Sequence, residues 1–196
     1  NVVVLSALPI YPAGWPLSPH IMAETRRIVE GHYRDERILL HGQVLPNVGS
    51  LGSVLRAMED TVSHHPIRAW KTFTHFPDFF DPGAGAWWLD DHERGLPAVG
   101  EPFIRKSLEL GIPTICVHKG LSGGSRYSSP MDVGPAARTH RDANFVVYHS
   151  GYESGTFEVY VLSLEPGGGK QQISSGGGSF PRWRSPGEIL YLTTDQ

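Results

Sequence analysis

Between Val2 and His149, short apolar runs alternate with helical patterns, and this alternation constrains the fold more than any other feature of the sequence. The runs recur at intervals of roughly 30–45 residues, a spacing typical of βαβ units in a parallel sheet. Several are apolar throughout instead of alternating, as expected for strands covered on both faces. The predicted strands are Val2–Leu8, Ile38–Leu45, Ile67–Thr74, Thr114–His118 and Phe145–His149.

Helix-start and helix-stop signals separate these runs. Ser18 is suited to cap a helix that begins with Pro19, because its hydroxyl can accept from the free N–H groups of the first turn. Gly111 and Pro113 are suited to end another helix. The sequence therefore predicts an α/β fold with helices at Ser18–Gly31, Ser50–Ser63, Glu101–Leu110 and around Met131–Arg138.

The pattern changes after Gly155. Thr156–Leu164 alternates apolar and polar side chains, Glu188–Thr193 supplies another strand pattern, and no helical pattern follows. This segment is predicted to be antiparallel. We therefore expect two parts, a βα segment over residues 1–153 and a β-rich segment over residues 156–196.

Composition narrows the class of protein. A net charge of −3 and a pI near 6.4 favour neither nucleic acid nor an anionic membrane as partner. The longest apolar runs are too short to span a bilayer, and no secretory signal is visible, which favours a soluble, cytoplasmic protein. Asn1 is an unusual first residue, so the native N-terminus is expected upstream. Cys116, the single cysteine, excludes an intramolecular disulfide and is expected in the core.

Candidate chemistry lies at the ends of the predicted strands, where parallel barrels place their functional residues. These ends carry His41, Lys71, His75, His118, Lys119 and His149. Each histidine could simply be half-buried and hydrogen-bonded to a loop. His118 and His149, however, occupy equivalent places in VHKG and YHSG, and imidazole is a good ligand for zinc, iron or manganese.

The segments WKTFT, WWLDD, ICVHKG, SRYSSPMDVGP and FVVYHSGYE resemble metal-dependent hydrolases of the amidohydrolase superfamily, over residues 1–153. The resemblance implies a TIM barrel that uses one or two divalent metals to hydrolyse amides or lactones, or to decarboxylate aromatic acids. His118 and His149 would match the histidines that end the fifth and sixth strands. Lys71 falls near the place where binuclear members carry a carboxylated lysine, although it could instead be a snorkelling surface residue.

Two parts of that family pattern are missing from the sequence. The family's first strand ends in a metal-binding His-x-His pair, and its eighth strand ends in an aspartate that activates water. Neither has a counterpart here. The expected fold is therefore a partial or oligomerically completed TIM-type (βα) barrel with a C-terminal antiparallel β segment.

The segment TFEVYVLSLEPGGGKQQISSGGGSFPRWRSPGEILYLT resembles one WD40-like blade of TolB-type propellers. One blade cannot bury its own faces. The chain therefore has the pattern of two proteins joined near Gly151–Thr156, as in an environmental fragment, a frameshifted gene or a fusion. We expect the open sheet to associate into a homo-oligomer, unless the tail caps one of its edges.

Two classes of function remain. In the first, the chain is a hydrolase or decarboxylase of a small molecule. A divalent metal, zinc first with iron or manganese as alternatives, would be bound by His118, His149 and Lys71, and substrate by Arg126, Tyr127, His41 and His75. Arg126 suits a substrate carboxylate, although it could be a solvated loop residue.

In the second class, the chain is a non-catalytic α/β scaffold that assembles through its β-rich tail. A different enzyme on a rearranged fold is a third possibility. The aromatic loop from Phe76 to Trp88 could form a substrate wall or a small core of its own.

Overall fold

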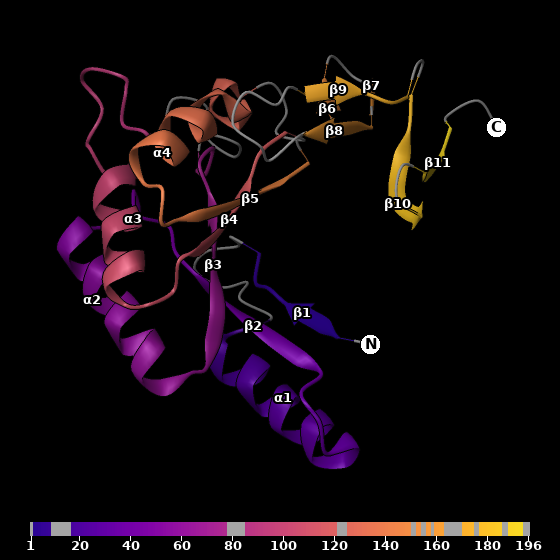
Figure 1. Cartoon of the computed structure of the whole chain (residues 1–196). Helices are drawn as coiled ribbons and strands as arrows, with labels where there is room; N and C mark the ends of the chain where they lie inside the picture. The colour runs from indigo at the N-terminus through magenta and orange to yellow at the C-terminus, as the bar shows by residue number, and fades with distance from the viewer. Residues whose placement is uncertain are drawn as a thin grey trace. The chain divides into compact units, whose positions relative to one another are not determined.

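The structure is a computed structural model, and it divides into two compact units, Asn1–Tyr148 and His149–Gln196. It describes residues 2–8, 17–77, 85–120, 125–149, 152–153, 156–157, 159–162, 170–174, 177–185 and 188–193. Figure 1 shows the chain with its elements labelled.

The first unit contains a five-stranded, curled parallel sheet, a half-barrel whose strands alternate with helices. The strands lie side by side in chain order, and every pair is parallel. The predicted α/β class is therefore confirmed. The strands are β1 (Val3–Leu5), β2 (Ile38–Gln43), β3 (Ile67–Phe73), β4 (Thr114–His118) and β5 (Asn144–Tyr148).

Three of these strands, β1, β2 and β3, are shorter than predicted, and β5 has the predicted length but is shifted by one residue. β1 keeps only the centre of the apolar run from Val2 to Leu8. β5 ends one residue early because His149 adopts a left-handed backbone conformation, with φ 59°, which breaks the extended chain.

Four α-helices connect the strands: α1 (Pro19–Tyr33), α2 (Leu51–His64), α3 (Gly100–Glu109) and α4 (Val133–Thr139). The predicted cap is confirmed, since the Ser18 hydroxyl accepts from the backbone N–H of Ile21 at 3.3 Å. The helix expected from Met131 begins instead at Val133, because Pro130–Asp132 forms a 3₁₀ turn.

The hydrophobic core lies between the sheet and the helices, which gather along one face of the sheet in Figure 1. Leu40, Trp70 and Ile115 project from successive strands, and Met58 and Phe103 meet them from α2 and α3. All five are at most 1% exposed. Cys116 is buried as predicted.

A register shift between β2 and β3 sets which side chains reach this core. Leu40 pairs with Ile67, but His41 pairs with Ala69, so β3 carries one extra residue. The extra residue lets both Ile67 and Trp70 enter the core. Gly42 packs so closely against the Trp70 ring that a Cβ atom there would lie 2.5 Å from it.

The second unit contains short strands that pair only in twos among its described residues. The three antiparallel pairs are Tyr152–Glu153 with Thr156–Phe157, Tyr160–Leu162 with Lys170–Gln172, and Ser179–Ser185 with Glu188–Leu192. Within it, Val159 is buried, and its N–H donates to the Ser174 hydroxyl at 2.7 Å.

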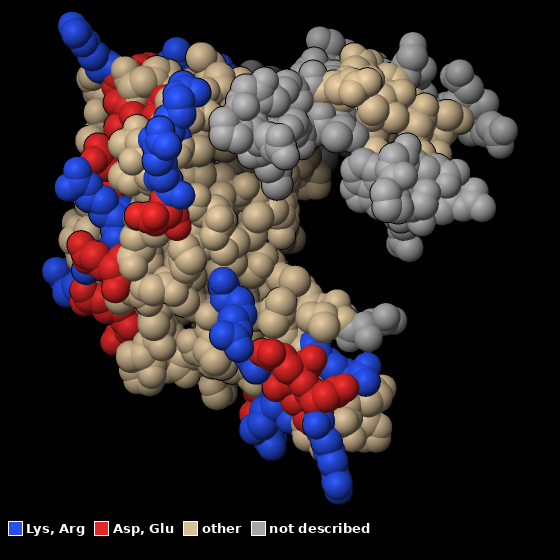
Figure 2. Space-filling model, in the orientation of Figure 1, with Lys and Arg blue, Asp and Glu red and all other residues tan. Residues whose placement is uncertain are grey.

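Charged side chains of both signs gather over the helices in Figure 2, and the surface between them is mostly uncharged. Many are paired; Lys106, for example, lies 2.9 Å from both Glu59 and Glu109. None of the described helices has the length and apolar character needed to cross a bilayer.

The edge strand β1 generates a prediction about assembly. Val3 and Val4 are 54% and 45% exposed, and apolar edge strands promote association. We expect the full chain to elute above its 21.6 kDa monomer mass in size-exclusion chromatography with light scattering. Val4→Lys should shift it toward monomer, because a charged side chain blocks edge pairing. A parent chain that stays monomeric at all concentrations would contradict this.

Candidate functional site

Side chains alternate across each strand, so residues next to the core residues point to the opposite face of the sheet. We call this opposite side the inner face. His41 and Gln43 lie there on β2, Lys71 and Phe73 on β3, and Cys116 and His118 on β4, with Tyr148 on β5. The polar residues of the strands are therefore collected on one surface.

The strand register arranges the inner face in rows. Gln43, Lys71 and Cys116 are paired across β2, β3 and β4. One step nearer the carboxyl ends, Phe73 pairs with His118, and His118 with Tyr148. Residues in one row of a parallel sheet are neighbours, so Lys71 lies at the centre of this surface.

Lys71 is only 4% exposed, and its Nζ has no hydrogen-bond partner among the residues that the structure describes. Nζ lies 3.4 Å from the centroid of the Tyr148 ring and 4.9 Å from that of Phe73. Aromatic faces stabilise the ammonium form only in part. Burial therefore lowers the pKa of Lys71 from its ordinary 10.5 to about 8.

His41 and Cys116 lie beside Lys71, with His41 Nε2 3.8 Å from the Cys116 Sγ. Burial, helped by the positive charge of Lys71, lowers the pKa of His41 to about 4, so its imidazole is neutral at pH 7. Burial also raises the pKa of the Cys116 thiol, which keeps it protonated. The centre of the inner face is thus weakly solvated, with Lys71 carrying charge at pH 7 beside a neutral imidazole and a neutral thiol.

The three predicted histidines of the first unit meet this surface at different points. His118 stacks on Phe73, with ring centroids 5.0 Å apart, and its ring lies 5.0 Å from that of His75. The structure therefore brings His75 and His118 together, and His41 and Lys71 lie on the same face. His149 is the first residue of the second unit, and its role as a metal ligand stays a prediction.

The side chains on the inner face are of the kinds that bind divalent metals. Too few of the described ones lie together to form a complete ligand shell. Imidazoles are available from His41, His75 and His118, and Lys71 is buried as carboxylation would require. Among the described residues, however, no group of three or more His, Cys, Asp or Glu side chains is placed to hold a metal ion. Within the first unit, a fuller shell would therefore need a carboxylated Lys71.

Lys119 directly follows β4, and its side chain lies on the side of the sheet that faces the helices. There its contacts hold a neighbouring loop. Its side chain is fully buried, and Nζ lies 2.8 Å from both carboxylate oxygens of Asp132. Asp132 also accepts from the backbone N–H of Leu89 at 2.8 Å, and Lys119 donates to the Tyr127 carbonyl. Unlike Lys71, this lysine has its buried charge compensated.

Arg126 and Tyr127 contact a different set of residues from those of the inner face. Tyr127 is buried against Trp88, with ring centroids 4.9 Å apart, and Arg126 pairs with Glu93 at 2.6 Å. Of the aromatic loop, Trp87 packs in the main core and Trp88 in a small cluster with Ala86 and Tyr127, whereas Phe79 and Phe80 lie outside the described residues.

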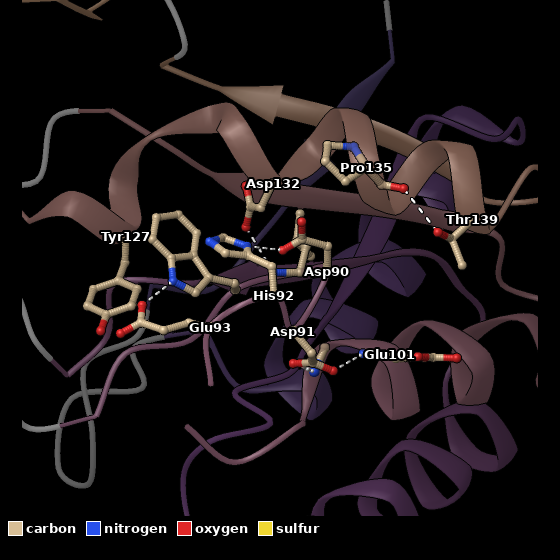
Figure 3. A network of polar contacts seen from close by, with 12 residues as sticks. Asp90, Asp91, His92, Glu93, Glu101, Tyr127, Asp132, Pro135 and Thr139 are labelled. Atoms are coloured by element: carbon tan, nitrogen blue, oxygen red, sulfur yellow. Dashed lines mark hydrogen bonds and ion pairs between the residues drawn. The ribbon is translucent and has the colours of Figure 1, made fainter. Parts of the chain in front are cut away.

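The WWLDD segment also has structural contacts (Figure 3). Asp90 pairs with His92 at 2.5 Å, and the Trp88 indole donates to Glu93. Asp91 accepts from three backbone N–H groups at the start of α3, those of Val99, Gly100 and Glu101. The WWLDD segment therefore fixes the loop that precedes α3.

Two residues of the inner face, Gln43 and Tyr148, were not among the site residues predicted from the sequence. Both amide atoms of the Gln43 side chain are buried without a hydrogen-bond partner among the described residues. Tyr148 supplies the ring against Lys71. The strand register brings them to Lys71, and only the position of each at the carboxyl end of a predicted strand could have singled them out.

Comparisons with known proteins returned no match: no family model, no curated protein and no solved structure matches the chain.

The pKa of His41 generates a prediction about pH. Between pH 6.5 and about 4, the unfolded chain binds a proton at His41 that the folded chain does not. The free energy of unfolding should therefore decrease as the pH drops through this window. His41 should account for at most about 3 kcal/mol of this decrease. His41→Gln should flatten the curve of urea stability against pH between 6.5 and 4. Parallel curves for parent and variant would contradict the assignment.

The Lys119–Asp132 pair generates a second prediction. Lys119→Met would leave a buried carboxylate without its partner and should destabilise the fold by about 3–5 kcal/mol. Lys119→Met combined with Asp132→Leu should recover part of that loss. Lys106→Met is the matched control, because Lys106 makes its ion pairs at the surface, and its urea midpoint should stay near that of the parent.

Proposed function

We propose that the first unit is the central part of a metal-dependent hydrolase of the amidohydrolase type, acting on an amide, a lactone or a carboxylated small molecule. The observation that carries the proposal is the gathering of His41, Lys71, His75 and His118 on the inner face of a parallel half-barrel. Functional groups of (βα) barrels lie at the carboxyl ends of their strands, as most of these do.

His118 and His149 are the proposed metal ligands, and Lys71 would join them once its amine is carboxylated. A bound divalent ion would polarise the scissile carbonyl and lower the pKa of a water molecule. The neutral imidazole of His41 can donate to or accept from a substrate oxygen, and the rings of Phe73 and Tyr148 would exclude water from an apolar substrate.

The ammonium form of Lys71 is favoured by the present contacts. Aromatic faces attract cations and repel anions, and Nζ lies against two such faces. A carbamate on Lys71 would therefore have to move away from Tyr148 toward a metal. The single-metal form, with Lys71 unmodified, is the one that these contacts support.

Metal content tests this proposal and separates it from the non-catalytic scaffold. In equilibrium dialysis against Zn²⁺, we expect the full chain to bind about one ion weakly by elemental analysis, because two or three protein ligands leave the coordination shell incomplete. His118→Ala should lose this ion, while His64→Ala, at an exposed helix end, should keep it. A parent chain that retains no metal would favour the scaffold.

A further inference from the structure

Three buried polar groups without hydrogen-bond partners among the described residues lie close together on β2 and β3. They are the Lys71 amine, the side-chain amide of Gln43 and Nδ1 of His41. Gln43 and Lys71 are paired across the two strands, and His41 precedes Gln43 on the same face. Buried polar groups are nearly always hydrogen-bonded, so this set has the capacity to bind a ligand or water.

The Lys71 amine has the surroundings of a nucleophile. Its contacts among the described residues include no carboxylate; it lies against two aromatic rings, and Cys116 is its neighbour on β4. Lys119 is also buried, but it is bound to Asp132 and to a backbone carbonyl, which hold its ammonium group in place. A desolvated lysine without a counter-ion is the type that attacks carbonyl carbons.

We propose that Lys71 captures a small 2-oxo acid as an imine, with the Gln43 amide binding the acid's carboxylate. Gln43 is suited to this role because its NH₂ group donates, while its neighbour Lys71 supplies the nitrogen that reacts. Tyr148, whose ring lies against the Lys71 amine, is only partly buried on the edge strand β5, and a small molecule would reach the amine once this ring moved. This goes beyond the proposed hydrolysis and needs no metal.

The chemistry balances without an oxidant or a reductant. The neutral amine attacks the keto carbon and forms the C–N bond, and the carbonyl oxygen takes up a proton. The resulting carbinolamine then loses that oxygen as water, which carries away the two hydrogens of the amine. A carboxylated Lys71 could not react in this way, because its nitrogen lone pair is delocalised into the carbamate.

Reductive trapping tests the proposal on the full chain, with a chelator present so that no metal-bound carbamate can mask the amine. Pyruvate is the probe, and cyanoborohydride supplies the hydride that converts the imine to a stable secondary amine. The chain has four lysines, Lys71, Lys106, Lys119 and Lys170, so peptide mass mapping assigns each product. We expect Lys71 to be modified about ten-fold faster than Lys106, since the Gln43 amide lies beside Lys71 to hold the carboxylate, whereas Lys106 is paired with Glu59 and Glu109.

Gln43→Leu is the variant that tests carboxylate recognition. It should slow trapping of pyruvate but leave trapping of acetaldehyde, which has no carboxylate, at the parent rate. Circular dichroism and the thermal midpoint would show that the variant is folded. Equal modification of Lys71 and Lys106, or modification of Lys71 only after unfolding, would overturn the imine. Equal slowing with both probes would overturn the role of Gln43. Metal retention is measured separately, so the two proposals can fail independently.

Discussion

The apolar layer between the five-stranded sheet and its helices fixes where every polar side chain of the strands can go. Leu40, Trp70 and Ile115 are buried against α2 and α3, and side chains alternate along each strand. Because one set of strand side chains is buried in the core, the alternate set of side chains lies on the inner face. Lys71 is placed at the centre of that face because Trp70 belongs to the core.

The two buried lysines of the first unit show how different surroundings give one residue type two roles. Asp132 and the Tyr127 carbonyl compensate the charge of Lys119, which makes it part of the scaffold. Two aromatic ring faces compensate the charge of Lys71 only partly. The lowering of its pKa to about 8 corresponds to roughly 3 kcal/mol of free energy that disfavours the charged amine. A native fold retains such a group more readily when it serves a site than when it only packs.

The segments from which the amidohydrolase-like pattern was predicted do not all contact the same part of the fold. WKTFT carries Lys71 and ICVHKG carries His118, and both lie on the inner face. In the WWLDD segment, Asp91 accepts from backbone N–H groups at the start of α3, and the Leu89 N–H donates to Asp132. The SRYSSPMDVGP segment provides Asp132 and also Tyr127, which packs against Trp88. These segments thus include residues of the inner face and residues that support the loops near Lys119.

The sequence by itself determined the α/β class, the order of strands and helices and the Ser18 cap, because these depend on local patterns of apolar residues and helix signals. It also singled out His41, Lys71, His75 and His118 by their positions near strand ends. Only the tertiary structure decided that Gln43 and Tyr148 join them and that Arg126 and Tyr127 contact Glu93 and Trp88 instead. Strand register and the extra residue in β3 select those neighbours, and both depend on packing between segments far apart in the chain.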